Sequence, residues 1–238
     1  VTSDKHFSIA SAKKGTHPMD LDLSALFGSS PKTVMTDETV VTNYEELHYY
    51  TSQLQNYLVQ VLQLESVACK DWLTNKVDRC VGGKVAKQQC AGALQLPLNN
   101  VGVMALDYNG KEGIATSIGH SPLTALISPT AGSRNAIAEA LTNIVWAPLK
   151  DGLQSVSLSA NWMWACRNKG EDARLYEAVE AASDFAIELG INIPTGKDSL
   201  SMKQKYPEGG DVIAPGTVII SAAAHCTDVQ KVVEPVFK

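Results

Sequence analysis

Residues 170–203 read GEDARLYEAVEAASDFAIELGINIPTGKDSLSMK, and the first part of this stretch has the pattern of an amphipathic helix. Apolar side chains recur at spacings of three and four residues, which places them on one helix face. Gly190 follows the last of them and is a typical residue for ending a helix. We therefore predict a helix over 172–189 that covers a sheet with this face. Its apolar residues are Leu175, Val179, Ala182, Phe185, Ala186 and Leu189.

The polar stretch that follows this helix allows two interpretations. Pro194 and Gly196 are typical of a loop, whose charges would simply face water. Lys197, Asp198 and Ser199 also place a cation, a carboxylate and a hydroxyl on a short piece of backbone, as a phosphate or metal–nucleotide site requires. The residues alone favour an ordinary polar turn, because such turns are common.

Helical and extended patterns alternate through most of the chain. Apolar spacing of three and four residues predicts helices, and short runs rich in β-branched residues predict strands. In chain order we predict a helix over 43–68, a loop or short bent strand over 78–92, strands over 101–108 and 123–128, a helix over 133–147, and strands over 154–159 and 216–224. This order favours an α/β (α+β) two-layer sandwich, in which helices cover one face of a mixed or antiparallel sheet.

Composition excludes several classes of protein. The chain has 238 residues, of which 45% are hydrophobic and 19% charged, as in ordinary globular proteins. A net charge of −5 without any basic run argues against nucleic acid as a partner. No apolar stretch is long enough to span a membrane. The five cysteines form no CxxC pair and no signal peptide is recognisable, so we expect a cytoplasmic protein.

The first 35 residues differ from the rest. Prolines, glycines and serines surround a short apolar patch at 21–27, which is too small to form its own core. We expect this segment to pack against something else. The chain begins with Val rather than Met, which suggests a piece of a longer chain.

Polar residues at two places could bind a ligand. Glu139 and Asn143 stand one above the other on the predicted helix 133–147, on the side away from its apolar residues. Their oxygens could hold Mg²⁺ with nucleotide phosphates, but an exposed helix face explains them equally simply. Asn100 directly precedes the strand predicted over 101–108, where it could be a ligand or a turn residue.

Other candidates are weaker. Lys70 could face a phosphate, although surface lysines are common. His120 has no Ser or Cys partner in a nucleophile motif, and no cysteine lies in a motif typical of a reactive thiolate. The sequence contains neither a GxxxxGK[ST] phosphate loop nor a GxGxxG fingerprint. A nucleotide would therefore have to bind in a different way.

Four segments identify a resemblance: DRCVGGKVAKQQCAGALQLPLNNVGVMAL, GSRNAIAEALTNI, LSANWM and the stretch 170–203. In this order they resemble the synthetase region of the large phosphoribosylformylglycinamidine synthases of purine biosynthesis, over nearly the whole chain. The resemblance implies that residues 1–40 are an extended arm from the end of the preceding domain. It implies that residues 41–238 are the N-terminal-type domain of the second synthetase half, similar to aminoimidazole ribonucleotide synthetase.

The resemblance also implies an activity. Members of this family are ATP-dependent ligases that convert formylglycinamide ribonucleotide to the amidine, with ammonia supplied from glutamine by a glutaminase domain. The expected partners are therefore formylglycinamide ribonucleotide, ATP and the remaining synthetase and glutaminase domains. A chain of this length would be inactive alone and could pair with a copy of itself through its sheet. The alternative is a structural module that binds nucleotide and Mg²⁺ without turnover.

Site residues carried over from the family are the same polar groups. Glu139 and Asn143 match helix residues that bind magnesium, and Asn100 stands where relatives commonly have aspartate. Lys70 falls near a lysine that faces the nucleotide. Lys197, Asp198 and Ser199 match a loop that holds phosphate between the halves, whereas His120 replaces a glutamate. The resemblance thus implies ATP or ADP and Mg²⁺ as ligands.

Overall fold

A computed structural model describes residues 3–28, 32, 34–69 and 83–236. The chain divides into two compact units, residues 1–36 and 37–238. In the first unit, β1 (His6–Ile9) pairs antiparallel with β2 (Met19–Asp22), which leads directly into the short helix α1 (Leu23–Phe27). The carboxylate of Asp22 accepts a hydrogen bond from the backbone N–H of Ser24 at 2.7 Å and so caps α1.

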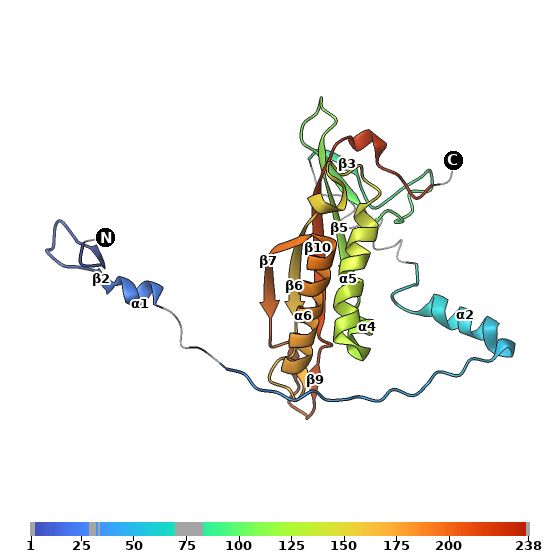
Figure 1. Ribbon diagram of the computed structural model, residues 1–238, viewed down its shortest axis with the longest axis horizontal. Helices are drawn as coiled ribbons and strands as arrows, with labels where there is room; N and C mark the ends of the chain where they lie inside the picture. Colours follow the sequence, from blue (N-terminus) through green and yellow to red (C-terminus); the bar gives the residue numbers. More distant parts are fainter. Residues whose placement is uncertain (1–2, 29–31, 33, 70–82, 237–238) are drawn as a thin grey trace. The chain divides into compact units, whose positions relative to one another are not determined.

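The second unit is built on a six-stranded mixed sheet (Figure 1). Across the sheet the strands are β3 (Val85–Lys87), β4 (Gly102–Ala105), β5 (Gly113–His120), β10 (Thr217–Cys226), β6 (Ser157–Met163) and β7 (Asn192–Ser199). All neighbours are antiparallel except β6 and β7, which α6 (Glu171–Leu189) connects as a parallel crossover. The predicted two-layer α/β fold class is confirmed.

Helices cover one face of this sheet. The helix α5 (Pro129–Ile144) lies against β5 and β10, flanked by α6 and by α4 (Pro122–Ile127). Ile137 and Ile144 of α5 are fully buried in one cluster with Leu158 of β6 and Ile220 of β10. Buried and exposed residues alternate along β5, which shows that the helices cover only one side of this strand.

Two details explain how closely α5 approaches β5. A methyl group on Gly119 would overlap the carbonyl oxygen of Ala136, so only glycine permits this contact. Ser117, two residues earlier on the same face, donates a hydrogen bond to the carbonyl oxygen of Ala140 at 2.6 Å. Small residues in β5 therefore set the distance between the sheet and the helix.

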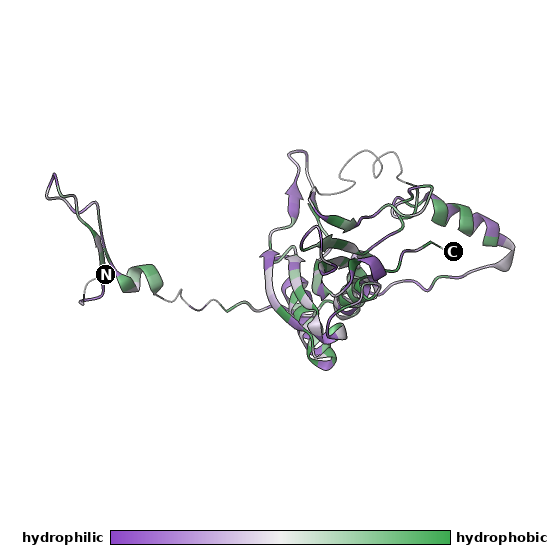
Figure 2. Cartoon of the chain, turned by 90° about the horizontal axis from the view of Figure 1, so that it is seen from above, coloured by the Kyte–Doolittle hydropathy of each residue, from purple (hydrophilic) through white to green (hydrophobic). Residues whose placement is uncertain are grey.

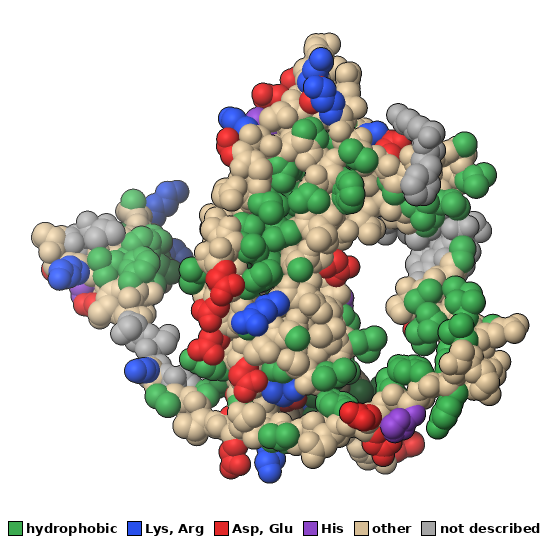
Figure 3. Space-filling view, turned by 45° about the vertical axis from the view of Figure 1, so that its right-hand side comes forward, with side chains coloured by type: hydrophobic (Ala, Val, Ile, Leu, Met, Phe, Trp, Pro, Cys, Tyr) green, Lys and Arg blue, Asp and Glu red, His purple; other side chains and the backbone are tan. Residues whose placement is uncertain are grey.

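The surface of the second unit has acidic and apolar regions. Glu180, Asp184 and Glu188 are exposed at four-residue spacing on α6, and acidic side chains gather on the face seen in Figure 3. The helix α2 (Leu54–Gln63) exposes apolar side chains such as Leu54. Figure 2 colours much of this helix as hydrophobic. Within the described ranges, no helix combines the length and apolar character needed to cross a membrane.

The shorter elements connect this framework. They are the 3₁₀ turns η1 (Thr51–Gln53), η2 (Gly152–Ser155) and η3 (Val229–Lys231), and the hairpin of β8 (Lys203–Lys205) with β9 (Asp211–Ile213).

One strand prediction was wrong, and one strand was missed. Residues 123–128 are not a strand, because 122–127 form α4, with Pro122 at its start. A short apolar run fits either element, and here Ala125 packs closely against Gly132 of α5. The prediction also missed β5, whose inward residues are glycine, alanine and serine rather than large apolar groups.

Residues 190–203 are not a simple polar loop, because 192–199 form β7 at the edge of the sheet. Pro194 is compatible with an edge strand, where a missing N–H costs no ladder bond. The helix predicted over 43–68 is limited to α2 and the preceding η1 turn, and the region 78–92 contains β3 in its described part. Val179, expected on the buried face of α6, is 44% exposed.

Candidate functional site

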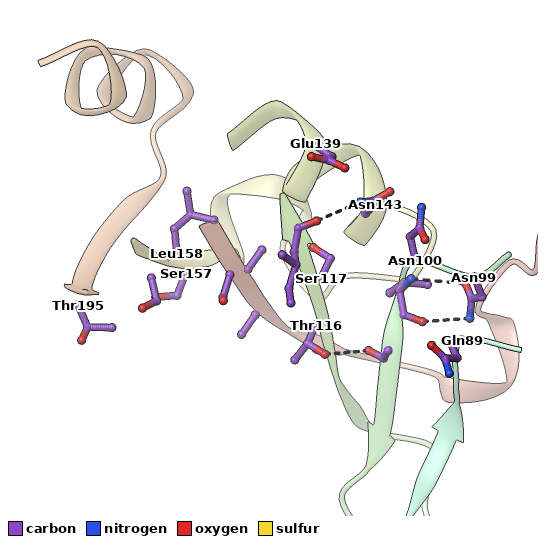
Figure 4. A pocket seen from close by; sticks show the side chains of 17 residues that line it. Gln89, Asn99, Asn100, Thr116, Ser117, Glu139, Asn143, Ser157, Leu158 and Thr195 are labelled. Carbon is purple, nitrogen blue, oxygen red and sulfur yellow. Dashed lines mark hydrogen bonds between the residues drawn. The ribbon is translucent and has the colours of Figure 1, made fainter. Parts of the chain in front are cut away.

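A groove of about 730 Å³ lies on the face of the sheet that the helices leave open (Figure 4). Its floor comes from β5, β10, β6 and β7, and Thr195 marks the β7 end. Asn100, Glu139 and Asn143 lie at the opposite end, beside β4. The structure therefore brings together the three residues that the sequence pointed to as metal ligands.

Strand register fixes the floor of the groove. One row of neighbouring side chains runs from Ile118 through Ser221 and Ser159 to Thr195. Because residues two apart share a face, the next row contains Thr116, Ala223 and Ser157. The floor thus offers hydroxyl groups between small apolar surfaces.

β4 stops short of the end of β5, which explains the role of Glu139 and Asn143 at this edge of the sheet. β10 pairs with β5 over its whole length, whereas β4 pairs with it over 113–116 alone. Beyond that point, Glu139 Oε2 accepts a hydrogen bond from the backbone N–H of His120 at 2.7 Å. Asn143 Nδ2 donates to the carbonyl oxygen of Ile118 at 3.1 Å. These two side chains take the place of a neighbouring strand, so they are more than a solvated helix face.

The two asparagines before β4 have different environments. Asn99 is buried, and its Nδ2 donates to the carbonyl oxygens of Gln88 and Val101 at 2.9 and 3.0 Å. Asn100 is exposed at the groove. Asn99 therefore fixes the turn, and Asn100 is the residue placed to meet a ligand.

The pleat of β7 separates the three residues of the Lys197 segment. Lys197 and Ser199 pair in register with Asn161 and Met163, and the Lys197 Nζ lies 2.7 Å from Ser199 Oγ. Asp198 pairs with Trp162 and therefore points to the other face. Lys197 follows Thr195 on the groove side of the strand, just beyond the groove lining.

The remaining candidates fall elsewhere. Lys70 lies outside the described residues. His120 alternates with the inward Gly119, so it lies on the open face, next to the groove residue Ile118 along β5. The hydroxyl residues of the floor were not predicted, although alternating serines in 154–159 were a usable signal.

Cys166 and Cys226 are not nucleophiles. Burial, followed by the nearby carboxylate of Asp172, raises the pKa of Cys166 to about 11. Burial also raises the pKa of Cys226. Both thiols therefore stay protonated at neutral pH.

A mixed sheet with helices on one face and a polar groove on the other defines a two-layer α/β domain with an accessible sheet face. The chain belongs to the FGAR-AT PurM_N-like domain family, whose model matches residues 69–225.

Comparison with known proteins agrees with this assignment. The chain is 42% identical over 231 residues to phosphoribosylformylglycinamidine synthase of Drosophila melanogaster, covering 96% of this chain and 17% of that protein. It is 42% identical over 223 residues to the Homo sapiens enzyme of the same name, covering 93% and 16%. The chain thus spans about a sixth of the length of these relatives.

Solved structures share the fold. PurLQS from Thermotoga maritima superposes with a TM-score of 0.58 at 15% identity, covering 93% of this chain and 32% of that chain. T. maritima PurL complexed with ATP gives a TM-score of 0.55 at 14% identity, covering 98% and 33%. T. maritima PurL complexed with FGAR gives 0.54 at 14%, covering 98% and 32%.

Proposed function

We propose that this chain is part of an ATP-dependent, amidine-forming ligase of de novo purine biosynthesis. The whole protein would convert formylglycinamide ribonucleotide to formylglycinamidine ribonucleotide, with glutamine as the nitrogen donor. Family membership and the names of the relatives support this, as do the ATP and FGAR complexes of proteins with the same fold. The chain alone is inactive in this proposal, because the other synthetase and glutaminase domains supply the rest of the site.

The groove is the proposed nucleotide site, and the convergence of Asn100, Glu139 and Asn143 at one end is the observation that supports it best. Since Asn143 uses its amide nitrogen on Ile118, its oxygen is left for a cation. Glu139 likewise uses one carboxylate oxygen. One carboxylate with two amide oxygens fits Mg²⁺ that also binds nucleotide phosphates, because Mg²⁺ usually takes one or two protein carboxylates.

The cation of Lys197 and the hydroxyl of Ser199 would then meet phosphate or substrate at the β7 end. Both lie on the groove side of the sheet, which supports a shared ligand face. Asp198 belongs to the same proposed segment, but it would act from the other face of the strand. Lys70 stays a candidate for contact with the nucleotide.

A structural role is the second candidate. Glu139 and Asn143 complete the edge of β5, so a nucleotide and Mg²⁺ held by them could stabilise the domain without turnover. In both cases the open sheet face would pair with another synthetase domain or a second copy of the chain. Cys69, Cys166 and Cys226 are free thiols, which supports the proposed cytoplasmic location.

Substitution of Glu139 in the full-length protein distinguishes the two roles. We expect Glu139→Ala and Glu139→Gln to abolish magnesium-dependent binding of ADP or ATP in calorimetric titrations. Glu188→Ala, an exposed carboxylate on α6, is the control and should bind normally. A fall in turnover at unchanged thermal stability supports catalysis, and lower stability with preserved kinetic constants supports the structural role. Normal binding in both Glu139 variants would contradict the proposed site.

A further inference from the structure

Residues 37–44, which we call the strap, run in an extended conformation past the N-terminal end of α6 (Figure 1). Tyr44 donates its hydroxyl to the carbonyl oxygen of Leu126 at the end of α4, at 2.9 Å. Thr39 donates to Glu177 of α6 at 3.3 Å. The strap is therefore attached to two helices that follow it in the sequence by more than eighty residues.

The main contact of the strap is at the first turn of α6. Asp37 Oδ1 accepts from the backbone N–H of Gly170 at 3.2 Å, and Oδ2 accepts from Asp172 and Ala173 at 3.1 and 3.4 Å. The backbone N–H of Glu38 binds the same carboxylate at 2.9 Å. Hydrogen bonds from the backbone of Glu38, and then from Gly170 and two amides of α6, lower the pKa of Asp37. The group is thus a carboxylate at neutral pH.

The local sequence of α6 provides no such cap. The residue before the helix is Gly170, which has φ of +82° and no side chain to accept these bonds. A methyl group at Gly170 would also lie 2.8 Å from Cγ2 of Val40, so the glycine leaves room for the strap. A helix whose first amides lack a partner is destabilised at that end. The cap that α6 needs comes from a residue 133 positions earlier.

The capped turn is linked to the carboxyl end of β7. Arg167 donates its N–H to Asp172 at 2.9 Å, and Asn168 accepts from Lys203 Nζ at 3.4 Å. Trp164, directly after β6, donates its backbone N–H to the carbonyl oxygen of Ser199 at 2.8 Å. The turn between β6 and α6 therefore bonds to Ser199 and, four residues further on, to Lys203.

We propose that Asp37 is a positioning residue: when the strap is docked, its carboxylate orders the first turn of α6 and, through the 164–169 turn, the end of β7 that presents Lys197 and Ser199. Docking of the strap and order at this end of the sheet are one coupled event.

Hydrogen exchange measured by mass spectrometry on the full-length protein tests the proposal. We expect Asp37→Ala to raise exchange about fivefold in peptides covering 168–175, the effect of losing a typical cap, and to raise it also in peptides covering 197–203. Asp37→Asn keeps one acceptor oxygen, so exchange should be intermediate. Peptides from α5 should not change.

Glu38→Ala is the matched control, because it removes the same charge from the next residue, whose carboxylate has no hydrogen bond to the described residues. Unchanged exchange at 168–175 in Asp37→Ala, or an equal change in Glu38→Ala, would overturn the cap. Exchange that rises at 168–175 but not at 197–203 would overturn the coupling to β7. Since Asp37→Asn retains part of the cap, it gives the same test if Asp37→Ala does not fold.

Discussion

Single residues at the junction of α5 and β5 determine both packing and the candidate site. Gly119 allows the helix to approach, while Glu139 and Asn143 bond to the strand on either side of it. A site built in this way depends on the separation of helix and strand as much as on its polar groups. Enlargement of Gly119 should therefore disturb the groove without touching its lining.

We expect Gly119→Ala to lower the free energy of unfolding by about 3 kcal/mol, because the new methyl group meets backbone atoms that cannot rotate away. Chemical denaturation followed by circular dichroism measures the change. Gly102→Ala is the comparison, since its methyl group would meet the side-chain oxygen of Thr116 at 3.2 Å. Equal stability of the two variants would contradict this account of the packing.

At the level of whole elements, segments with large apolar residues at regular spacing could be predicted from the sequence. Segments made mostly of small or polar residues could not. The helix over 172–189 and the strand over 216–224 follow from large apolar residues at regular spacing, and both are present. β5 and β7 were not predicted, because their sequences are rich in small and polar residues. Pairing with neighbouring strands determines the conformation of both segments. Asn100, Glu139 and Asn143 at one end of the groove were singled out from the sequence, whereas its hydroxyl floor and Thr195 were not.

The β1–β2 hairpin should respond to pH. The hydrogen bond to Asp20, at 3.2 Å, raises the pKa of His6 above 6.5, and the charges of Asp20, Asp4 and Asp22 act in the same direction. A raised folded-state pKa stabilises the paired strands fully below the unfolded value of 6.5, and this stabilisation is lost as pH rises through the folded-state pKa.

Nuclear magnetic resonance titration measures the pKa of His6, and amide exchange in 6–22 measures the stability of the paired strands. We expect exchange to be slower on the acidic side of the titration, and His6→Ala to remove the pH dependence. His48→Ala, outside the hairpin, should leave it intact. Exchange in 6–22 that does not follow the His6 titration would be evidence against a stabilising His6–Asp20 interaction.

For the molecule as a whole, the open sheet face is the surface that we expect to bind a partner. It combines the polar groove with exposed apolar side chains, among them Met104, Ile114 and Ile118, the last 59% exposed. Burying such a face removes apolar area from water, so pairing through the sheet is expected.

Ile114→Lys should shift the 238-residue chain toward monomer in analytical ultracentrifugation, because a charge on the open face opposes its burial. Ile187→Lys, on the outer surface of α6 where the side chain is 73% exposed, should leave association unchanged. Stability of either monomer should change by about 0.5 kcal/mol at most. Association that persists unaltered in Ile114→Lys would place the contact elsewhere.

The fact that β4 is shorter than β5 has one more consequence. A strand with unused N–H and C=O groups along one side is a template on which another chain can add a strand and start to aggregate. At 117–120 of β5, Glu139 and Asn143 occupy those groups with side chains, one of them negatively charged. The residues proposed to bind a ligand therefore also block the addition of a foreign strand at this part of the sheet, a role that is separate from any ligand chemistry.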